Sequence, residues 1–174
     1  EEISFGMNPD QIRKEIDSKF KLRKNGLFDK ETDRRVSAVL VTHVLGHPAR
    51  LNDLLLVCKD FDLPLVEDAA EAIGTSFEGK HVGTFGQLSA LSFNGNKTIT
   101  TGGGGAILTN DLDLAEKAKQ VTTTAKEPHK WEFLHNEIAF NYRMPNINAA
   151  LGVAQLERLS QVLQKKRAIA DIYK

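Results

Sequence analysis

The sequence predicts an α/β fold in which a mostly parallel central sheet is flanked by helices. The segment Val36–Val44 (VSAVLVTHV) is almost entirely β-branched or apolar, which is typical of a strand buried on both faces. Leu51–Phe61 then repeats its apolar residues at the helical period. Pro64–Asp68 (PLVED) indicates a second strand, and the alanine-rich segment 69–73 follows it. Two successive β-α units predict a parallel sheet.

The N-terminal region carries the signals of a helix start. Asn8 is a suitable N-cap and Pro9 suits the first helical position, so we predict a helix from this point to about Arg23. The polar residues 24–35 are predicted to form a loop. Four-residue spacing places one apolar stripe on the helix: Ile12, Ile16 and Phe20.

Further short elements follow the second strand. The segment Thr75–Thr84 is predicted to be a small hairpin or loop, and Leu88–Phe93 and Gly105–Thr109 are predicted strands. Asn110 and Asp111 are expected to cap a helix over Leu112–Val121.

The C-terminal part is predicted to be a loop and a long helix. Residues 122–144 have no clean periodicity and are rich in polar and aromatic side chains, whereas Asn146–Tyr173 repeats at helical spacing. The apolar face of this helix is expected to serve core or dimer packing: Ile147, Leu151, Leu156, Leu159 and Leu163.

Composition restricts the classes of function. Twenty-three basic residues balance twenty-three acidic ones, so charge does not draw the chain to nucleic acid or to an anionic membrane. The single cysteine, Cys58, sits in an apolar helical run and is expected to be a buried hydrophobic residue. The sequence has neither a signal peptide nor an apolar stretch of about 18 residues, and we expect a cytoplasmic protein. Both ends have the character of cut ends, which predicts a fragment.

The stretch Ser92–Gly105 (SFNGNKTITTGGGG) raises the question of what Lys97 does. A phosphate-binding P-loop requires glycine directly before the lysine, and Asn96 occupies that place. The glycines follow the lysine, where they cannot wrap phosphates, so a nucleotide-binding P-loop is a weaker alternative. A solvated lysine with no catalytic role is the other alternative.

Asp68 supplies a second polar group at the same predicted edge of the sheet. It ends its strand in the crevice where open parallel sheets bind ligands. Pyridoxal 5'-phosphate needs a lysine for a Schiff base, a carboxylate for its pyridine nitrogen, and donors for its phosphate. Lys97, Asp68 and Ser92 could supply these three groups, so the pattern favours this cofactor.

Two longer runs carry a resemblance to a known family. Residues 66–111, from VEDAAEAIG to AILTND, and residues 137–159 (EIAFNYRMPNINAALGVAQLERL) resemble the DegT/StrS family of nucleotide-sugar aminotransferases. The resemblance implies the aspartate aminotransferase fold, fold type I. It makes residues 1–174 part of the large pyridoxal-phosphate-binding domain, ending in the helix that leads toward a small C-terminal domain.

The resemblance also implies roles for individual residues. Lys97 matches the lysine that holds the cofactor and moves the proton, Asp68 the carboxylate on the pyridine nitrogen, and Ser92 a phosphate ligand. Asn141 matches an asparagine that reaches the phosphate of the neighbouring subunit's cofactor, which implies a homodimer. Glu71 falls where many members carry glutamine near the cofactor's phenolic oxygen, and our hypothesis is that Glu71 is protonated.

The implied reaction transfers an amino group from L-glutamate, which becomes 2-oxoglutarate, to a nucleotide-linked keto-sugar. The details are most similar to enzymes acting at C4 of UDP-linked 4-keto-6-deoxy-N-acetylhexosamines in bacterial routes to legionaminic acid and related sugars. A non-catalytic regulatory or assembly protein on the same fold is the alternative from another class.

Several residues keep open roles. His43 and His47 could contact cofactor or substrate or serve the entry to the helix, and Arg143 could bind an anion or form a structural salt bridge. The spacing of His129 and His135 does not fit a metal site, so no metal is expected. Gly102–Gly105 are expected to turn the backbone beside the cofactor with dihedral angles that other residues resist.

Overall fold

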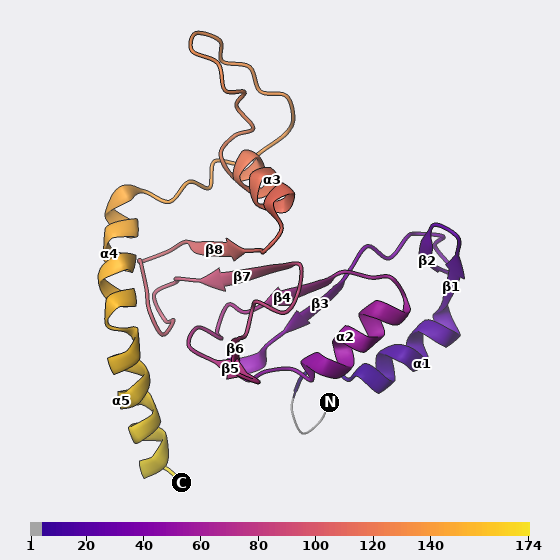
Figure 1. Cartoon of the computed structure of the whole chain (residues 1–174), viewed down its shortest axis with the longest axis horizontal. Coiled ribbons are helices and arrows are strands. Elements are labelled where there is room, and N and C mark those ends of the chain that lie inside the picture. The colour runs from indigo at the N-terminus through magenta and orange to yellow at the C-terminus, as the bar shows by residue number, and fades with distance from the viewer. Residues whose placement is uncertain (1–4) are drawn as a thin grey trace. The chain divides into compact units, whose positions relative to one another are not determined.

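A computed structural model describes residues 5–174, and the chain forms two compact units (Figure 1). The first unit comprises the residues up to Leu91, and the second comprises Ser92–Lys174. Among residues 5–174, no helix combines the length and the apolar character needed to cross a membrane.

The first unit begins with helix α1, Pro9–Lys19, as the cap predicted. The side chain of Asn8 accepts hydrogen bonds from the backbone N–H groups of Asp10 and Gln11. The helix ends before the predicted Arg23, because Phe20–Arg23 forms strand β1 instead.

Strand β1 pairs with an antiparallel strand β2, Gly26–Asp29, so the predicted polar loop is wrong. Gly26 turns the chain at a φ of 130°, a conformation that side chains resist. Leu27 follows and is fully buried. A turn glycine beside a buried leucine therefore makes a hairpin inside a largely polar stretch.

Three parallel strands form the sheet of the first unit. They are β3 (Val39–Thr42), β4 (Leu65–Asp68) and β7 (Leu88–Ser92), in the order β3, β4, β7 (Figure 1). Thr42 lies opposite Asp68, and Asp68 lies opposite Ala90. The prediction of a parallel sheet is confirmed for these strands.

The first of these strands is shorter and less buried than predicted. In β3, Val39 and Val41 are buried whereas the Leu40 side chain is 59% exposed, so only one face packs against the core in this chain. Leu45 and Gly46 adopt positive φ angles, and the chain leaves the strand in the 3-10 helix η1, Val44–Gly46. The predicted strand through Val44 therefore ends early.

Helix α2, Leu51–Asp60, agrees with its prediction and supplies much of the core. Leu51, Leu54 and Val57 are fully buried, and the helix contacts β4 and α1. Cys58 is buried beside them, as predicted, and burial raises the pKa of its thiol.

Two segments complete the first unit. Strands β5 (Ser76–Phe77) and β6 (Lys80–His81) pair antiparallel and confirm the predicted hairpin. The alanine-rich residues 69–73 form turns rather than the helix that a second strand–helix unit requires. This segment has five residues, too few for a stable helix, and turn hydrogen bonds fix it.

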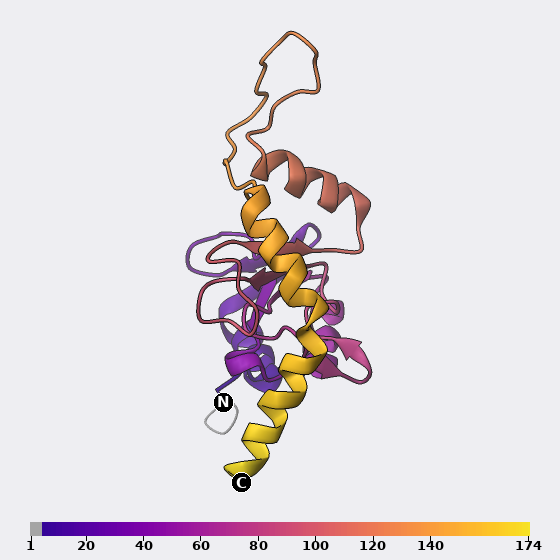
Figure 2. The ribbon, with the colours of Figure 1, turned by 90° about the vertical axis from the view of Figure 1, so that its left-hand side faces the viewer.

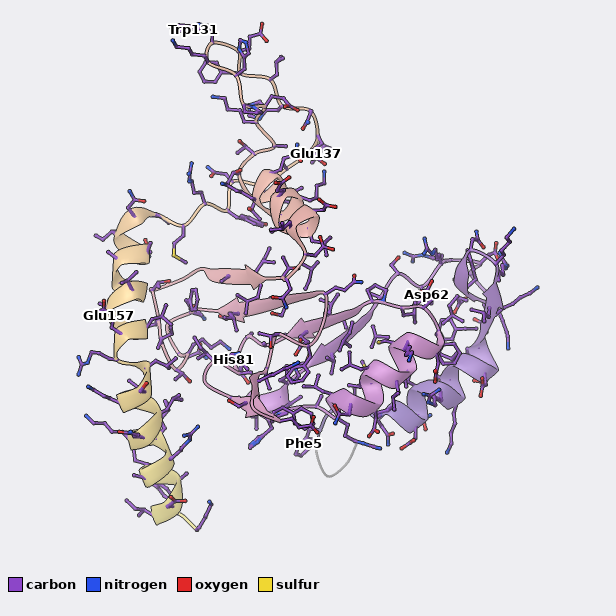
Figure 3. The ribbon with its side chains drawn as sticks, in the orientation of Figure 1. Phe5, Asp62, His81, Trp131, Glu137 and Glu157 are labelled. Atoms are coloured by element: carbon purple, nitrogen blue, oxygen red, sulfur yellow. The ribbon has the colours of Figure 1, made fainter. Side chains whose placement is uncertain are left out.

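The second unit begins with the last residue of β7 and contains strand β8, Gly105–Leu108, and helix α3, Leu112–Thr122. The Asp111 side chain accepts a hydrogen bond from the Leu114 N–H, which confirms the predicted cap. Residues 123–145 form a long loop, and the exposed Trp131 lies at its tip (Figure 3).

Two helices stand where one was predicted. They are α4 (Asn146–Glu157) and α5 (Leu159–Ile172), which follow one another directly (Figure 2). Arg158 separates them with φ −100° and ψ 0°, which lie outside the α-helical range. The helical hydrogen bonding is therefore interrupted at this residue. In this chain Ile147, Leu151 and Leu156 are exposed, and their predicted packing role stays a prediction.

Candidate functional site

Asp68 stands at the carboxyl end of β4, where its carboxylate has a fixed orientation. The Oδ1 atom accepts a hydrogen bond from the Ala70 N–H at 3.1 Å. The Oδ2 atom accepts a long hydrogen bond from the Thr42 hydroxyl at 3.4 Å, across the parallel pair β3–β4. The side chain is only half-buried, so the carboxylate retains acceptor capacity toward a ligand at this edge of the sheet.

Glu67 precedes Asp68 and faces the other side of the sheet, because side chains alternate along a strand. It is fully buried. Its Oε1 accepts hydrogen bonds from the N–H groups of Phe85 (2.7 Å) and Gly86 (2.6 Å). Its Oε2 accepts from the Gly83 N–H at 2.8 Å and lies 3.0 Å from His43 Nε2.

These donors decide the charge of Glu67. Burial alone would raise the pKa of the carboxyl group, but the hydrogen bonds from His43 and from three backbone N–H groups outweigh it. The pKa therefore lies below its ordinary value, and the buried group is an anion that ties residues 83–86 to β4. Glu67 was not among the residues predicted from the sequence, although a charged residue within the apolar strand PLVED was the available signal.

His43 has a structural set of contacts. Its Nδ1 accepts a hydrogen bond from the Ala49 N–H at 3.1 Å, so Nε2 carries the proton and donates it to Glu67. The ring is fully buried, between the end of β3 at Thr42 and the 3-10 helix η1. Of the two open roles of His43, these contacts match the helix-entry role. His47 is exposed.

Ser92 and Lys97 flank one tight turn of the second unit. The Ser92 Oγ accepts a hydrogen bond from the Asn94 N–H at 3.3 Å, and the Lys97 N–H donates to the Asn94 carbonyl at 3.1 Å. Both side chains are half-buried. Since Ser92 Oγ acts as an acceptor in this turn, its own O–H can donate to a ligand.

The glycines after Lys97 shape the return of the chain. Gly102 and Gly104 adopt φ angles of 80° and 98°, so the predicted need for glycine is confirmed at these two positions. Phe93 closes the loop: its N–H donates to the Gly104 carbonyl at 2.9 Å, and its carbonyl accepts from the Thr101 N–H at 3.0 Å.

The other predicted site residues lie in exposed segments. Glu71 is exposed in the turn after β4, within the first unit. Asn141 lies in the long loop of the second unit, where it forms an isolated antiparallel bridge with Thr123. Arg143 follows it and is also exposed. The first unit thus brings Asp68 and Glu71 into one strand-to-turn segment, and the second brings Ser92 and Lys97 into one turn.

No group of three or more potential metal ligands occurs among residues 5–174.

Comparison with known proteins then identifies the family. The model of the DegT/DnrJ/EryC1/StrS aminotransferase family matches residues 4–174. The chain belongs to this family. Structural neighbours of the chain are pyridoxal-phosphate-dependent aminotransferases of fold type I, which confirms the predicted fold class and family.

Individual relatives of this DegT/DnrJ/EryC1/StrS chain carry the names of sugar-modifying enzymes. The GDP-perosamine synthase of Escherichia coli O157:H7 is 42% identical over 147 residues, which are 84% of this chain and 40% of that protein. The UDP-4-amino-4,6-dideoxy-N-acetyl-beta-L-altrosamine transaminase of Campylobacter jejuni subsp. jejuni serotype O:23/36 is 32% identical over 139 residues, covering 79% and 37% of the two chains.

A solved structure agrees with these relatives. It is PseC of Helicobacter pylori, an aminotransferase involved in the biosynthesis of pseudoaminic acid, with a TM-score of 0.77 and 31% identity. The match covers 83% of this chain and 39% of PseC. The chain therefore spans roughly two fifths of the length of the proteins that it resembles.

Proposed function

We propose that the protein is a pyridoxal-phosphate-dependent sugar aminotransferase with Lys97 as its catalytic lysine. The observation that carries this proposal is the set of side chains that each unit presents. In the first unit Asp68 ends strand β4 with an oriented carboxylate, and in the second unit Ser92 and Lys97 flank one tight turn. Membership of an aminotransferase family supports the same assignment.

The side chains present fit the chemical groups of the cofactor. Asp68 is a half-buried carboxylate whose two oxygens are already oriented, as required to hold a protonated pyridine nitrogen. The Ser92 hydroxyl can donate to a phosphate, and Lys97 carries the amine that bonds to the aldehyde. When bound, pyridoxal phosphate supplies an electron sink for the carbon that loses its proton.

We assign a separate role to each of three residues, Lys97, Asp68 and Glu71. Lys97 holds the cofactor through its Nζ and, once displaced by the amino donor, takes and returns the proton. Asp68 keeps the pyridine nitrogen protonated by charge and by a hydrogen bond. Glu71 would lie near the phenolic oxygen of the cofactor.

Asn141 belongs to a further part of the proposal, the homodimer. Its place in an exposed loop leaves it accessible to a neighbouring subunit, whose cofactor phosphate it would reach. The exposed apolar side chains of α4, among them Ile147 and Leu151, suit contact with another protein surface.

We propose a nucleotide-linked keto-sugar as the amino acceptor and L-glutamate as the donor. A UDP-linked 4-keto-6-deoxy-N-acetylhexosamine is our choice, supported by the name of the C. jejuni relative. The name of the E. coli relative, GDP-perosamine synthase, makes a GDP-linked keto-sugar the competing substrate.

An assay with both sugar nucleotides tests the proposed reaction. The protein is incubated with L-glutamate and either keto-sugar, and the amino sugar and 2-oxoglutarate are quantified. The amino sugar and 2-oxoglutarate should form in equal amounts, and kcat/KM should be higher for the UDP-linked sugar. A higher value for the GDP-linked sugar would correct the substrate, and absence of both products would contradict the function.

A further inference from the structure

One face of α4 lies against the loop that carries Lys97. Asn148, Gly152 and Gln155 occupy positions i, i+4 and i+7 of this helix, so they share a face. All three contact Thr100 or Thr101, which lie three and four residues after Lys97. The helix and the loop both belong to the second unit.

Two side chains of α4 bind backbone groups of this loop. Gln155 Oε1 accepts a hydrogen bond from the Thr100 N–H at 2.9 Å. Asn148 Nδ2 donates to the Thr101 carbonyl at 2.5 Å. Consecutive loop residues are thus held by groups that lie 55 and 47 positions away in the sequence.

The packing between these two contacts is close. A Cβ atom at Gly152 would lie 2.9 Å from Thr101 Cγ2, nearer than real Cβ contacts come. Glycine therefore permits the approach of the helix that lets Asn148 and Gln155 reach the backbone. Thr101 is 2% exposed, and its neighbour Ile99 is 1% exposed.

The loop backbone around Lys97 is consequently held on both sides. On the N-terminal side, the Lys97 N–H is bonded to the Asn94 carbonyl. On the C-terminal side, only Thr98 and the buried Ile99 separate Lys97 from the residues that α4 binds. A lysine that must attack one fixed carbon benefits from a fixed Cα, because its own side chain has many rotamers.

We propose that Gln155 and Asn148 are positioning residues that hold the backbone of the Lys97 loop for covalent capture of the cofactor. The inference rests on the proposed function of Lys97. We call the two hydrogen bonds of Gln155 and Asn148 to the loop the clamp. Loosening the clamp should slow bond formation at Lys97 and leave binding of the cofactor's ring and phosphate unchanged.

The clamp itself is tested first, without cofactor, by hydrogen exchange of the Thr100 amide. Gln155→Leu removes the acceptor and should accelerate exchange roughly two- to tenfold, the factor for the net contribution of one hydrogen bond. Gln155→Glu keeps an acceptor oxygen and should exchange like the unaltered protein. Gln164→Leu, the same change at an exposed position of α5, is the matched control.

The positioning role is tested next by two binding measurements. The rate at which pyridoxal 5'-phosphate becomes fixable to Lys97 by borohydride should fall roughly two- to tenfold in Gln155→Leu. The Kd of pyridoxamine 5'-phosphate, which cannot bond to the lysine, should stay the same. Asn148→Leu should act in the same way, and it supplies a second variant should Gln155→Leu fold poorly.

An unchanged capture rate in both leucine variants would overturn the positioning role. An equal loss of pyridoxamine 5'-phosphate affinity would also overturn it, since the residues would then shape the pocket in general. If the unaltered protein captured no cofactor at Lys97, the proposed function would fail and the positioning role with it. The exchange data would still show whether the clamp exists.

Discussion

His43 Nε2 and Glu67 Oε2 lie 3.0 Å apart, and both side chains are fully buried in the first unit. Because the Nδ1 of His43 accepts the Ala49 N–H, its Nε2–H is directed at Glu67, whose folded-state pKa is lowered. A hydrogen-bond donor beside a buried carboxylate offsets part of the cost of burying that charge. The pair links the residue that follows β3 to β4, and Glu67 also binds the backbone of residues 83–86.

The first prediction concerns acid stability. The folded-state pKa of Glu67 is lowered from its ordinary value of 4.5. Its contribution to the free energy of unfolding is therefore fully present above about pH 4.5 and is lost as the pH falls through the lowered folded-state value. Glu67→Gln should flatten this acid limb in denaturant titrations at a series of pH values.

The same variant should also lose stability at neutral pH. A glutamine amide cannot accept at both ends, so at least one of the N–H groups of residues 83–86 loses its acceptor. We expect a loss of about 1–3 kcal/mol, the cost of a buried unsatisfied group. Glu78→Gln, at an exposed position, is the control. An unaltered acid limb in Glu67→Gln would refute the assignment of the lowered pKa.

A second prediction concerns the charge at the strand end. Asp68→Asn keeps the shape and the acceptor oxygen but removes the negative charge, so the pyridine nitrogen would lose its proton. On the proposed function kcat should fall on the order of a hundredfold, the scale of a lost electrostatic contact in an active site.

Thr42→Val provides the comparison for Asp68→Asn. It removes only the long 3.4 Å hydrogen bond to Asp68 and should change kcat by about a factor of two or less. Steady-state kinetics on both variants distinguish the effect of the Asp68 charge from the effect of the hydrogen bond that orients Asp68. Equal effects of the two substitutions would argue against a role for the charge of Asp68.

A third prediction concerns Glu71. If Glu71 lies near the phenolic oxygen, Glu71→Gln should still bind cofactor, because an amide can donate a hydrogen bond there. Replacing the carboxyl group by an amide should change the visible absorbance of the bound cofactor. Spectra recorded between acidic and alkaline pH provide the measurement. Identical pH profiles for the two proteins would show that the charge of Glu71 does not matter.

A fourth prediction concerns the packing of α4. Gly152→Ala should lower the free energy of unfolding by about 1 kcal/mol, because overpacking against the β-branched Thr101 exceeds the gain in helix propensity. Ala150→Gly, on the exposed side of the same helix, measures the difference in helix propensity between alanine and glycine alone. A stabilised Gly152→Ala protein would mean that the helix has room to move.

Local signals in the sequence predicted much of the fold. The caps Asn8 and Asp111 marked the starts of α1 and α3, and apolar periodicity marked α2. The hairpin β1–β2 was missed although its Asn25–Gly26 dipeptide is a recognised turn signal, because the surrounding polar residues suggested a loop.

The supporting contacts of the candidate site could not be predicted in the same way. Glu67 on β4 and His43, which directly follows β3, are 24 positions apart, and Gln155 reaches Thr100 over 55 positions. Such pairs depend on how elements pack, which periodicity does not reveal. Asp68, Ser92 and Lys97 were singled out because each lies at or just after a strand end, where a short motif is readable.

Covalent mapping of the cofactor shows which lysine bonds to it. The protein is incubated with pyridoxal 5'-phosphate, reduced with borohydride, digested, and the modified peptide identified by mass spectrometry, with Lys97→Ala as the control. A single phosphopyridoxyl group on Lys97 is expected, and it should be absent from the variant. A protein that binds the cofactor but carries the label on another lysine would rule out Lys97 as the catalytic lysine.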